Sequence, residues 1–101
     1  MTMLLGLNSD SYDEAQIARL DVAEAKVVVH FEPNGEIISI DACDDVEAQL
    51  MSGLDYVVID DTRQALESFR EYDVTVLECP RGATIDDVME GYLFRTLREV
   101  E

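Results

Sequence analysis

The sequence has few of the residues that build metal centres and disulfide frameworks. It contains one histidine, His30, and two cysteines, Cys43 and Cys79, and it has no C-x-x-C spacing. This pattern is neither a zinc site nor a disulfide framework. We therefore expect both cysteines to be free thiols in a reducing compartment.

Long hydrophobic runs are also missing. No apolar stretch approaches the roughly 20 residues that a membrane span requires. The N-terminal segment MTMLLGLNSD lacks the basic n-region and the long apolar core of a signal peptide. We expect a cytoplasmic protein that does not bind membranes.

Basic residues are scarce. Asp and Glu number 23 against 7 Lys and Arg, the formal net charge is -16, and Lys26 is the only lysine. Such a surface repels nucleic acid and anionic membranes, so neither is an expected partner. Abundant acid with little lysine is typical of a salt-accumulating halophile, because molar salt screens the self-repulsion. An ordinary acidic cytosolic protein is the alternative.

The rest of the composition fits one small core. A length of 101 residues predicts a single domain over residues 1-101. A hydrophobic content of 48% and a mean hydropathy of -0.03 exclude a disordered acidic tail.

The segment KVVVHFEPNGEIISID predicts a β-hairpin. Its Asn34-Gly35 dipeptide favours a two-residue type I′ turn between antiparallel strands. That turn pairs Phe31 with Ile38, and Val29 with Ile40, on one side of the hairpin, so the register agrees with the hydrophobic alternation.

The other segments predict buried strands and amphipathic helices. MLLGLN predicts a short buried strand, and YVVI and VTVL are apolar runs typical of strands buried on both faces. DDVEAQLMSG predicts a helix capped at Asp44, three residues before Glu47, and ended by Gly53. DTRQALESFREY predicts a second helix. TIDDVMEGYLFRTLREV predicts a third, which opens at Thr84 and has an apolar stripe that continues to Val100.

This order of elements predicts an α/β domain with a mixed sheet covered by helices on both faces. The simplest fit is a ribonuclease H-like three-layer arrangement with five strands in the order 3-2-1-4-5 and strand 2 antiparallel. In this arrangement the first and fourth strands diverge at their carboxyl ends, where a ligand is expected.

The chain resembles the small stand-alone domains of the dinitrogenase iron–molybdenum cofactor biosynthesis family, most closely from Leu54 to Leu97. GLDYVVID is similar to the family's Gly-Val-Asp-Val-Val-Ile strand, QALESFREYDVTVLEC to its Ala-Leu helix and following strand, and GATIDDVMEGYLFRTL to its C-terminal helix. The resemblance implies a carrier of an iron–sulfur or molybdenum-containing cluster. Two departures stand against it: DDTRQ replaces the family's Gly-Gly-x-Gly loop, and RLDVAEA replaces its His-Phe-Gly element.

Polar residues at the carboxyl ends of the strands are the candidate binding residues. Asp60 ends the central strand, while Asp61, three residues before Gln64, has the pattern of a helix N-cap. A solvated strand end is the alternative reading of Asp60. The candidate cofactor-binding residues are Asn8, Ser9, Asp10, Asp60, Arg63, Arg81 and Gly82. The two arginines could bind an anion or pair with nearby carboxylates.

The remaining reactive side chains, His30, Cys43 and Cys79, can each be explained by a structural role as well as by a functional one. His30 has no second ligand at metal-like spacing and is expected to be an ordinary strand residue. Cys43 and Cys79 follow strands four positions apart in the predicted sheet, roughly 19 Å, so they should not form a disulfide. Either thiol could ligate a soft metal alone, but a buried thiol is the default.

Three functions remain open at this point. The first is a non-enzymatic binding or carrier domain, for a metal–sulfur cofactor according to the resemblance. The second is the same fold without a cofactor, acting on a protein partner or as a homodimer. The third is a metal-dependent nuclease-like enzyme. Its acids would be Asp10, Glu47, Asp60 and either Asp86 or Asp87.

The acidic composition generates a prediction about salt. If the chain comes from a halophile, its thermal melting temperature should be higher in molar KCl than in dilute buffer, because the self-repulsion of a net charge of -16 is screened. Circular dichroism melts in both solutions measure this difference. Equal melting temperatures would contradict the halophilic origin.

Overall fold

Seven strands and two helices make up the regular elements of the described residues, which are 1-20, 22-60, 69 and 72-100 of this computed structural model. In chain order they are β1 (Thr2–Leu7), β2 (Ile17–Ala18), β3 (Ala25–Phe31), β4 (Ile37–Ala42), α1 (Val46–Ser52), β5 (Tyr56–Ile59), β6 (Thr75–Glu78), α3 (Ile85–Phe94) and β7 (Arg98–Val100).

The strands form one open, mixed sheet in the order β4-β3-β1-β5-β6-β7, with β2 paired to β1. β3 runs antiparallel to β1, whereas β5 is parallel to β1 and β6 is parallel to β5. The predicted α/β class is therefore confirmed, and the predicted strands lie in the predicted order. The sheet has seven strands instead of five, because β2 and β7 were not predicted.

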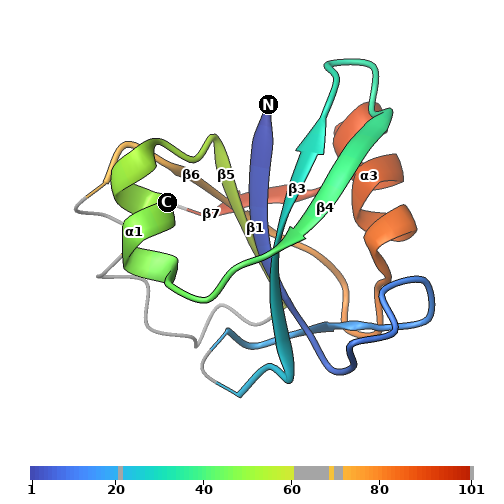
Figure 1. Cartoon of the computed structure of the whole chain (residues 1–101). Helices are drawn as coiled ribbons and strands as arrows, with labels where there is room; N and C mark the ends of the chain where they lie inside the picture. The colour runs from blue at the N-terminus through green and yellow to red at the C-terminus, as the bar shows by residue number, and fades with distance from the viewer. Residues whose placement is uncertain (21, 61–68, 70–71, 101) are drawn as a thin grey trace.

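Each face of the sheet has its own hydrophobic cluster. Among the described helices, α1 lies on one face and α3 on the other (Figure 1). On the α3 face, Ile85 and Val88 of the helix pack with Met3 and Leu5 of β1. On the α1 face, Leu50 of the helix packs with Leu4 of β1. Leu4 lies between Met3 and Leu5 in the sequence. Alternate residues of one strand thus enter opposite clusters, which explains why β1 is a continuous apolar run.

A glycine in β1 allows the second strand to approach. β2 pairs antiparallel with the end of β1, with Gly6 opposite Ala18. A Cβ atom added to Gly6 would lie 2.8 Å from the Cβ of Ala23 and 2.9 Å from the carbonyl oxygen of Ala18. Any side chain here would push Ala18 and Ala23 away from β1.

The hairpin is confirmed, but its turn differs from the predicted two-residue turn. The Glu32 N–H donates to the carbonyl of Glu36, and Gly35 has φ 87°, while Asn34 does not have a positive φ. This is a three-residue loop with a type I turn over Pro33 and Asn34 and a left-handed Gly35. Proline suits the first central position because its ring fixes φ near the required value.

The longer loop moves one predicted pair. Phe31 pairs with Ile37 instead of Ile38, and a register shift between His30 and Phe31 restores the predicted pairing of Val29 with Ile40. Ile38 becomes the extra residue on β4, and its exposed fraction is 62%.

Both described helices begin with a side-chain cap. α1 is capped by Asp45, whose carboxylate accepts from the Ala48 N–H at 3.1 Å, so the prediction of Asp44 was wrong by one residue. The predicted end at Gly53 is confirmed by its left-handed φ of 95°. α3 opens at Thr84 as predicted, and Thr84 forms a capping box with Asp87.

The third helix is shorter than its apolar stripe predicted. α3 ends at Phe94, where Arg95 adopts a left-handed conformation with φ 58°. The chain then returns as β7, which pairs antiparallel with β6 through Val76 and Val100. Val100 is apolar because it packs against the α1-face cluster as a strand residue, and not because the helix continues.

The second predicted helix lies almost entirely outside the described residues. Only Phe69 of its apolar face is described, and it is helical and buried in the α1-face cluster. Within the described chain, neither helix is long and apolar enough to cross a membrane.

The cap of α1 can be tested with a matched pair of substitutions. Asp45→Ala should lower the free energy of unfolding by about 1 kcal/mol relative to Asp44→Ala, because only Asp45 accepts a backbone N–H bond at the helix start. Each variant removes one exposed negative charge, so relief of self-repulsion cancels in the comparison. Urea unfolding measures the difference. Equal stabilities of the two variants would show that the Asp45 side chain does not stabilise the start of α1.

Candidate functional site

The carboxyl ends of the three parallel strands meet at one edge of the sheet, which we call the carboxyl edge. Met3 of β1 pairs with Tyr56 of β5, and Ile59 of β5 pairs with Glu78 of β6. The residues that follow these strands, Asn8, Asp60 and Cys79, therefore come to the same edge. This placement agrees with the sequence prediction that polar residues gather where the strands end.

Asn8 is tied to a residue that the sequence did not single out. The Asn8 N–H donates to the Gln16 carbonyl at 3.0 Å, and the Gln16 N–H donates to Oδ1 of Asn8 at 2.9 Å. Gln16 also forms an isolated bridge with Thr84. These contacts join the loop after β1 to the start of α3. They depend on tertiary backbone pairing, so no local sequence signal identifies Gln16.

The two residues after Asn8 are peripheral. The hydroxyl of Ser9 accepts from the Ser11 N–H at 3.1 Å, which stabilises the local turn. Asp10 is exposed to solvent. Both remain predicted site residues, and no described contact links either of them to Asp60.

Arg81 and Gly82 lie in the turn that leads into α3. The Ala83 N–H donates to the Pro80 carbonyl at 3.2 Å, and Gly82 has φ 83°, as a type II turn requires at its third position. At the helix start that follows, the Asp87 N–H is already bonded to the Thr84 hydroxyl at 3.2 Å. The acidic first turn of α3 also complements the helix dipole, so this helix start gives no added support to an anion site.

Asp60 carries the strongest signal at the carboxyl edge. Its Oδ1 atom is buried, and among the described residues it has no hydrogen-bond partner. An unsatisfied buried polar group costs about 1–3 kcal/mol, and a charged group costs more. Natural structures keep few such groups, so each one calls for an explanation. A bound ligand that donates to this oxygen is one such explanation.

Cys79 is buried beside Asp60 and is held in its neutral form. Burial, together with the negative charge of Asp60, raises the pKa of the Cys79 thiol to about 12. Burial also raises the pKa of the Cys43 thiol. Thiolates, not thiols, are the metal ligands and nucleophiles, so both groups are poor in either role at neutral pH.

The described residues do not fit a metal–sulfur cluster. The two cysteines are free and buried, with Cys43 in the α1-face cluster and Cys79 in the α3-face cluster. Within the described ranges, no group of three His, Cys, Asp or Glu residues is placed to hold a metal ion. The same finding applies to the acids predicted for a nuclease-like metal site. One of them, Asp87, is already part of the α3 capping box. Metal ligation by either cysteine alone stays a prediction.

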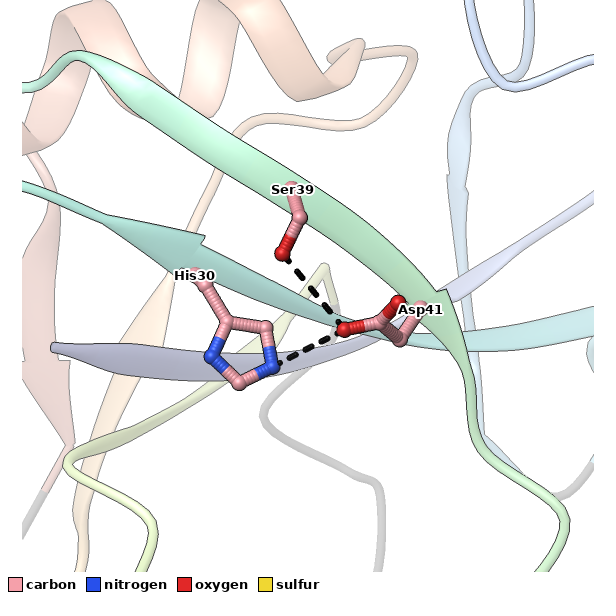
Figure 2. Close-up of polar contacts among 3 residues, drawn as sticks. All are labelled: His30, Ser39 and Asp41. Atoms are coloured by element: carbon pink, nitrogen blue, oxygen red, sulfur yellow. Dashed lines mark hydrogen bonds and ion pairs between the residues drawn. The ribbon is translucent and has the colours of Figure 1, made fainter.

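His30 lies far from the carboxyl edge, because it pairs with Thr2 at the start of β1. Figure 2 shows its Nε2 atom directed at the Asp41 carboxylate of β4, at 3.1 Å, with the Ser39 hydroxyl donating to the same oxygen at 3.5 Å. The His30 and Asp41 side chains are substantially exposed, at 41% and 64%. His30 is therefore an ordinary cross-strand partner, as the sequence suggested.

Two predicted residues lie outside the described part of the chain. Arg63 was predicted to bind at the carboxyl edge, and Asp61 was predicted to cap the second helix. Both fall within residues 61-68, so both stay predictions.

Comparison with known proteins finds solved structures of similar fold. No protein-family model matches the chain, and no curated protein matches it. Among solved structures, PH0822 is similar with a TM-score of 0.71 and 16% sequence identity over 99% of this chain and 96% of that chain. TM1290 from Thermotoga, described as a proposed NifB protein of the DUF35 family, is similar with a TM-score of 0.72 and 16% identity over 97% of this chain and 91% of that chain.

These findings correct the family prediction. The resemblance to the dinitrogenase iron–molybdenum cofactor biosynthesis family was wrong, because no family model matches and the similar structure TM1290 is placed in the DUF35 family instead. The resemblance rested on strands such as YVVI, whose apolar residues are explained by burial on both faces of the sheet. Any parallel central strand carries that pattern.

The environment of Cys79 generates a prediction about thiol reactivity. In a Cys43→Ser background, Cys79 should react very slowly with a disulfide reagent at pH 8, because its pKa of about 12 leaves little thiolate. Asp60→Asn should accelerate the reaction, since it removes the second cause of the raised pKa. Asp73→Asn, an exposed residue just before β6, is the control. An equal rate in the Asp60 and Asp73 variants would contradict the coupling.

Proposed function

We propose that this chain is a non-enzymatic binding domain that holds its ligand at the carboxyl edge of β1, β5 and β6. The observation that carries this proposal is the buried Oδ1 atom of Asp60, which has no hydrogen-bond partner among the described residues. A carboxylate with an unused acceptor is stabilised by a ligand that brings an N–H or O–H donor or a positive charge. The proposal therefore concerns a cationic or donor-rich small ligand.

The placement of the site supports this proposal. In open α/β sheets, ligands bind outside the carboxyl ends of the strands, where neighbouring strands diverge. Asp60 ends β5, which has β1 on one side and β6 on the other. Asn8 is exposed at the same edge, and the buried Cys79 beside Asp60 carries an uncharged thiol.

The arrangement of reactive groups favours binding over catalysis. General acid–base catalysis is most effective when a group with a pKa near the working pH lies within hydrogen-bond reach of the reacting proton. The single histidine is at the far end of β1, opposite Thr2, and Cys79 is held neutral. Among the described residues, Asp60 therefore has no histidine or thiolate partner with which to share a proton.

We also propose that the fold is ribonuclease H-like. The support is the order β4-β3-β1-β5-β6 with β3 antiparallel to β1, which is the 3-2-1-4-5 arrangement. In this proposal β2 and β7 are additions to the shared five-stranded sheet. They extend it by pairing with β1 and with the edge of β6.

A second candidate function is a protein-interaction module. It is favoured by a separate observation, the exposure of Leu93 and Phe94 next to each other at the end of α3. This surface is distant in sequence from Asp60.

The binding proposal can be tested on protein purified from the cells that produce it naturally, at the salt concentration found inside those cells. Native mass spectrometry, with elemental analysis of the same sample, should find a stoichiometric added mass or element on the wild-type chain. The Asp60→Asn variant should lose this addition, because the amide removes the negative charge of the side chain and replaces one acceptor oxygen with an NH₂ donor. Asp73→Asn should retain it. A wild-type mass equal to that of the sequence, with no bound element, would contradict the proposal.

A further inference from the structure

The C-terminal end of α3 presents an unusual pair of side chains. Leu93 and Phe94 are consecutive, large and apolar, and their exposed fractions are 48% and 66%. Single exposed apolar residues are common on soluble proteins, but neighbouring ones beside concave surface mark interaction sites. We call Leu93, Phe94 and the two hollows beside them the α3-end surface.

The first hollow lies between α3 and the strands β5, β6 and β7. Its volume is about 450 Å³, and Tyr56, Leu77, Tyr92 and Leu93 line it. The rings of Tyr56 and Tyr92 are packed edge to face with centroids 5.5 Å apart, and Tyr92 packs in the same way on Phe31 at 5.0 Å. This wall is fixed by aromatic packing, so the hollow is formed before anything binds.

The second hollow lies beside the first. Its volume is about 540 Å³, and it extends from the turn at Pro80 to Phe94. The two hollows share Gly91 and Leu97. A Cβ atom on Gly91 would lie 2.8 Å from Cδ2 of Leu97, so the glycine lets Leu97 fold back against the helix. Leu97 thus forms a wall that the two hollows share.

The charged residues around the two hollows indicate which kind of partner can bind there. Carboxylates outnumber cations around the two hollows: Glu99, Asp87 and Glu90 line them, against Arg95 and Arg81. The whole chain carries a formal net charge of -16, which attracts positively charged partners over long range and repels a second copy. The first hollow has more polar than apolar surface, and the second has more apolar than polar surface. The exposed Leu93 and Phe94, with carboxylates in excess around the hollows, fit an amphipathic segment that carries apolar anchors and basic flanks.

We infer that the α3-end surface docks a positively charged amphipathic segment of a partner protein. The apolar side chains of the segment pack on Leu93 and Phe94 and enter the second hollow, and its Lys or Arg residues face Glu90 and Glu99. This inference does not rest on the ligand proposed at Asp60. It assigns a separate surface, and either one can fail without the other.

The test uses two synthetic peptides of roughly 16 residues, the length at which an isolated helix begins to form in water. Both carry Leu and Phe at helical spacing; one has Lys on its flanks and the other has Glu at the same positions. Each is titrated into the ¹⁵N-labelled full chain at the lowest salt at which circular dichroism shows it folded. The Lys peptide should shift the amide signals of residues 91-97, and its affinity should fall as salt is raised.

Matched variants decide which surface binds. The double variant Leu93→Ser, Phe94→Ser should weaken the Lys peptide by about tenfold or more, because exposed anchors dominate such interfaces. Met51→Ser, on α1 and 72% exposed, removes a comparable apolar side chain elsewhere and should bind like wild type. All of these residues are exposed, so the variants should fold.

Three results would overturn the inference. The first is no change in the signals of residues 91-97 at millimolar Lys peptide. The second is equally strong binding of the Glu peptide, which would show that the surface does not prefer a positively charged segment. The third is a wild-type dimer in analytical ultracentrifugation that Leu93→Ser, Phe94→Ser dissociates, which makes a second copy the occupant. None of these results would bear on the ligand at Asp60, which the mass measurement tests separately.

Discussion

The burial of β1 on both faces is the constraint on which the rest of the structure depends, because this strand contacts both hydrophobic clusters. Met3, Leu4, Leu5 and Leu7 have no exposed surface, and they alternate between the α3 face and the α1 face. A strand in this position can carry no charge on either side. The described acidic residues therefore lie on loops, helices, strand ends and the outer strands β4 and β7, and the carboxyl edge is one of these places.

Much of the fold follows from local sequence, and the exceptions have physical causes. Strand burial, the capping box at Thr84 and the helix end at Gly53 are decided by neighbouring residues, so the sequence indicates them. The end of α3 is different, because helix and strand both accept the apolar residues Leu97 and Val100. Antiparallel pairing of β7 with β6 decides between them, and that pairing joins residues distant from the helix pattern. Two-residue β2 is likewise defined only by its partner β1.

The candidate site was partly predictable for the same reason. That Asp60 ends a strand and that Cys79 ends the next is visible in the sequence, so their shared edge follows from parallel pairing. The unsatisfied oxygen of Asp60 and the raised pKa of Cys79 are not visible, because both depend on what surrounds each atom in three dimensions. Gln16 was missed because its role comes from backbone bonds to Asn8 and a bridge to Thr84. The family resemblance failed because it depended on apolar patterns that many sheets share.

The extra residue in β4 has a consequence for how the domain behaves in a crowded solution. β4 is an outer strand of the open sheet, and its free edge offers a template to which another chain can add. The register shift beside Ile38 twists this edge, and Asp41 adds a charge to it. A bent, charged outer strand is a poor template for a flat neighbouring strand. The irregularity that displaced one predicted pair thus works against edge-to-edge aggregation.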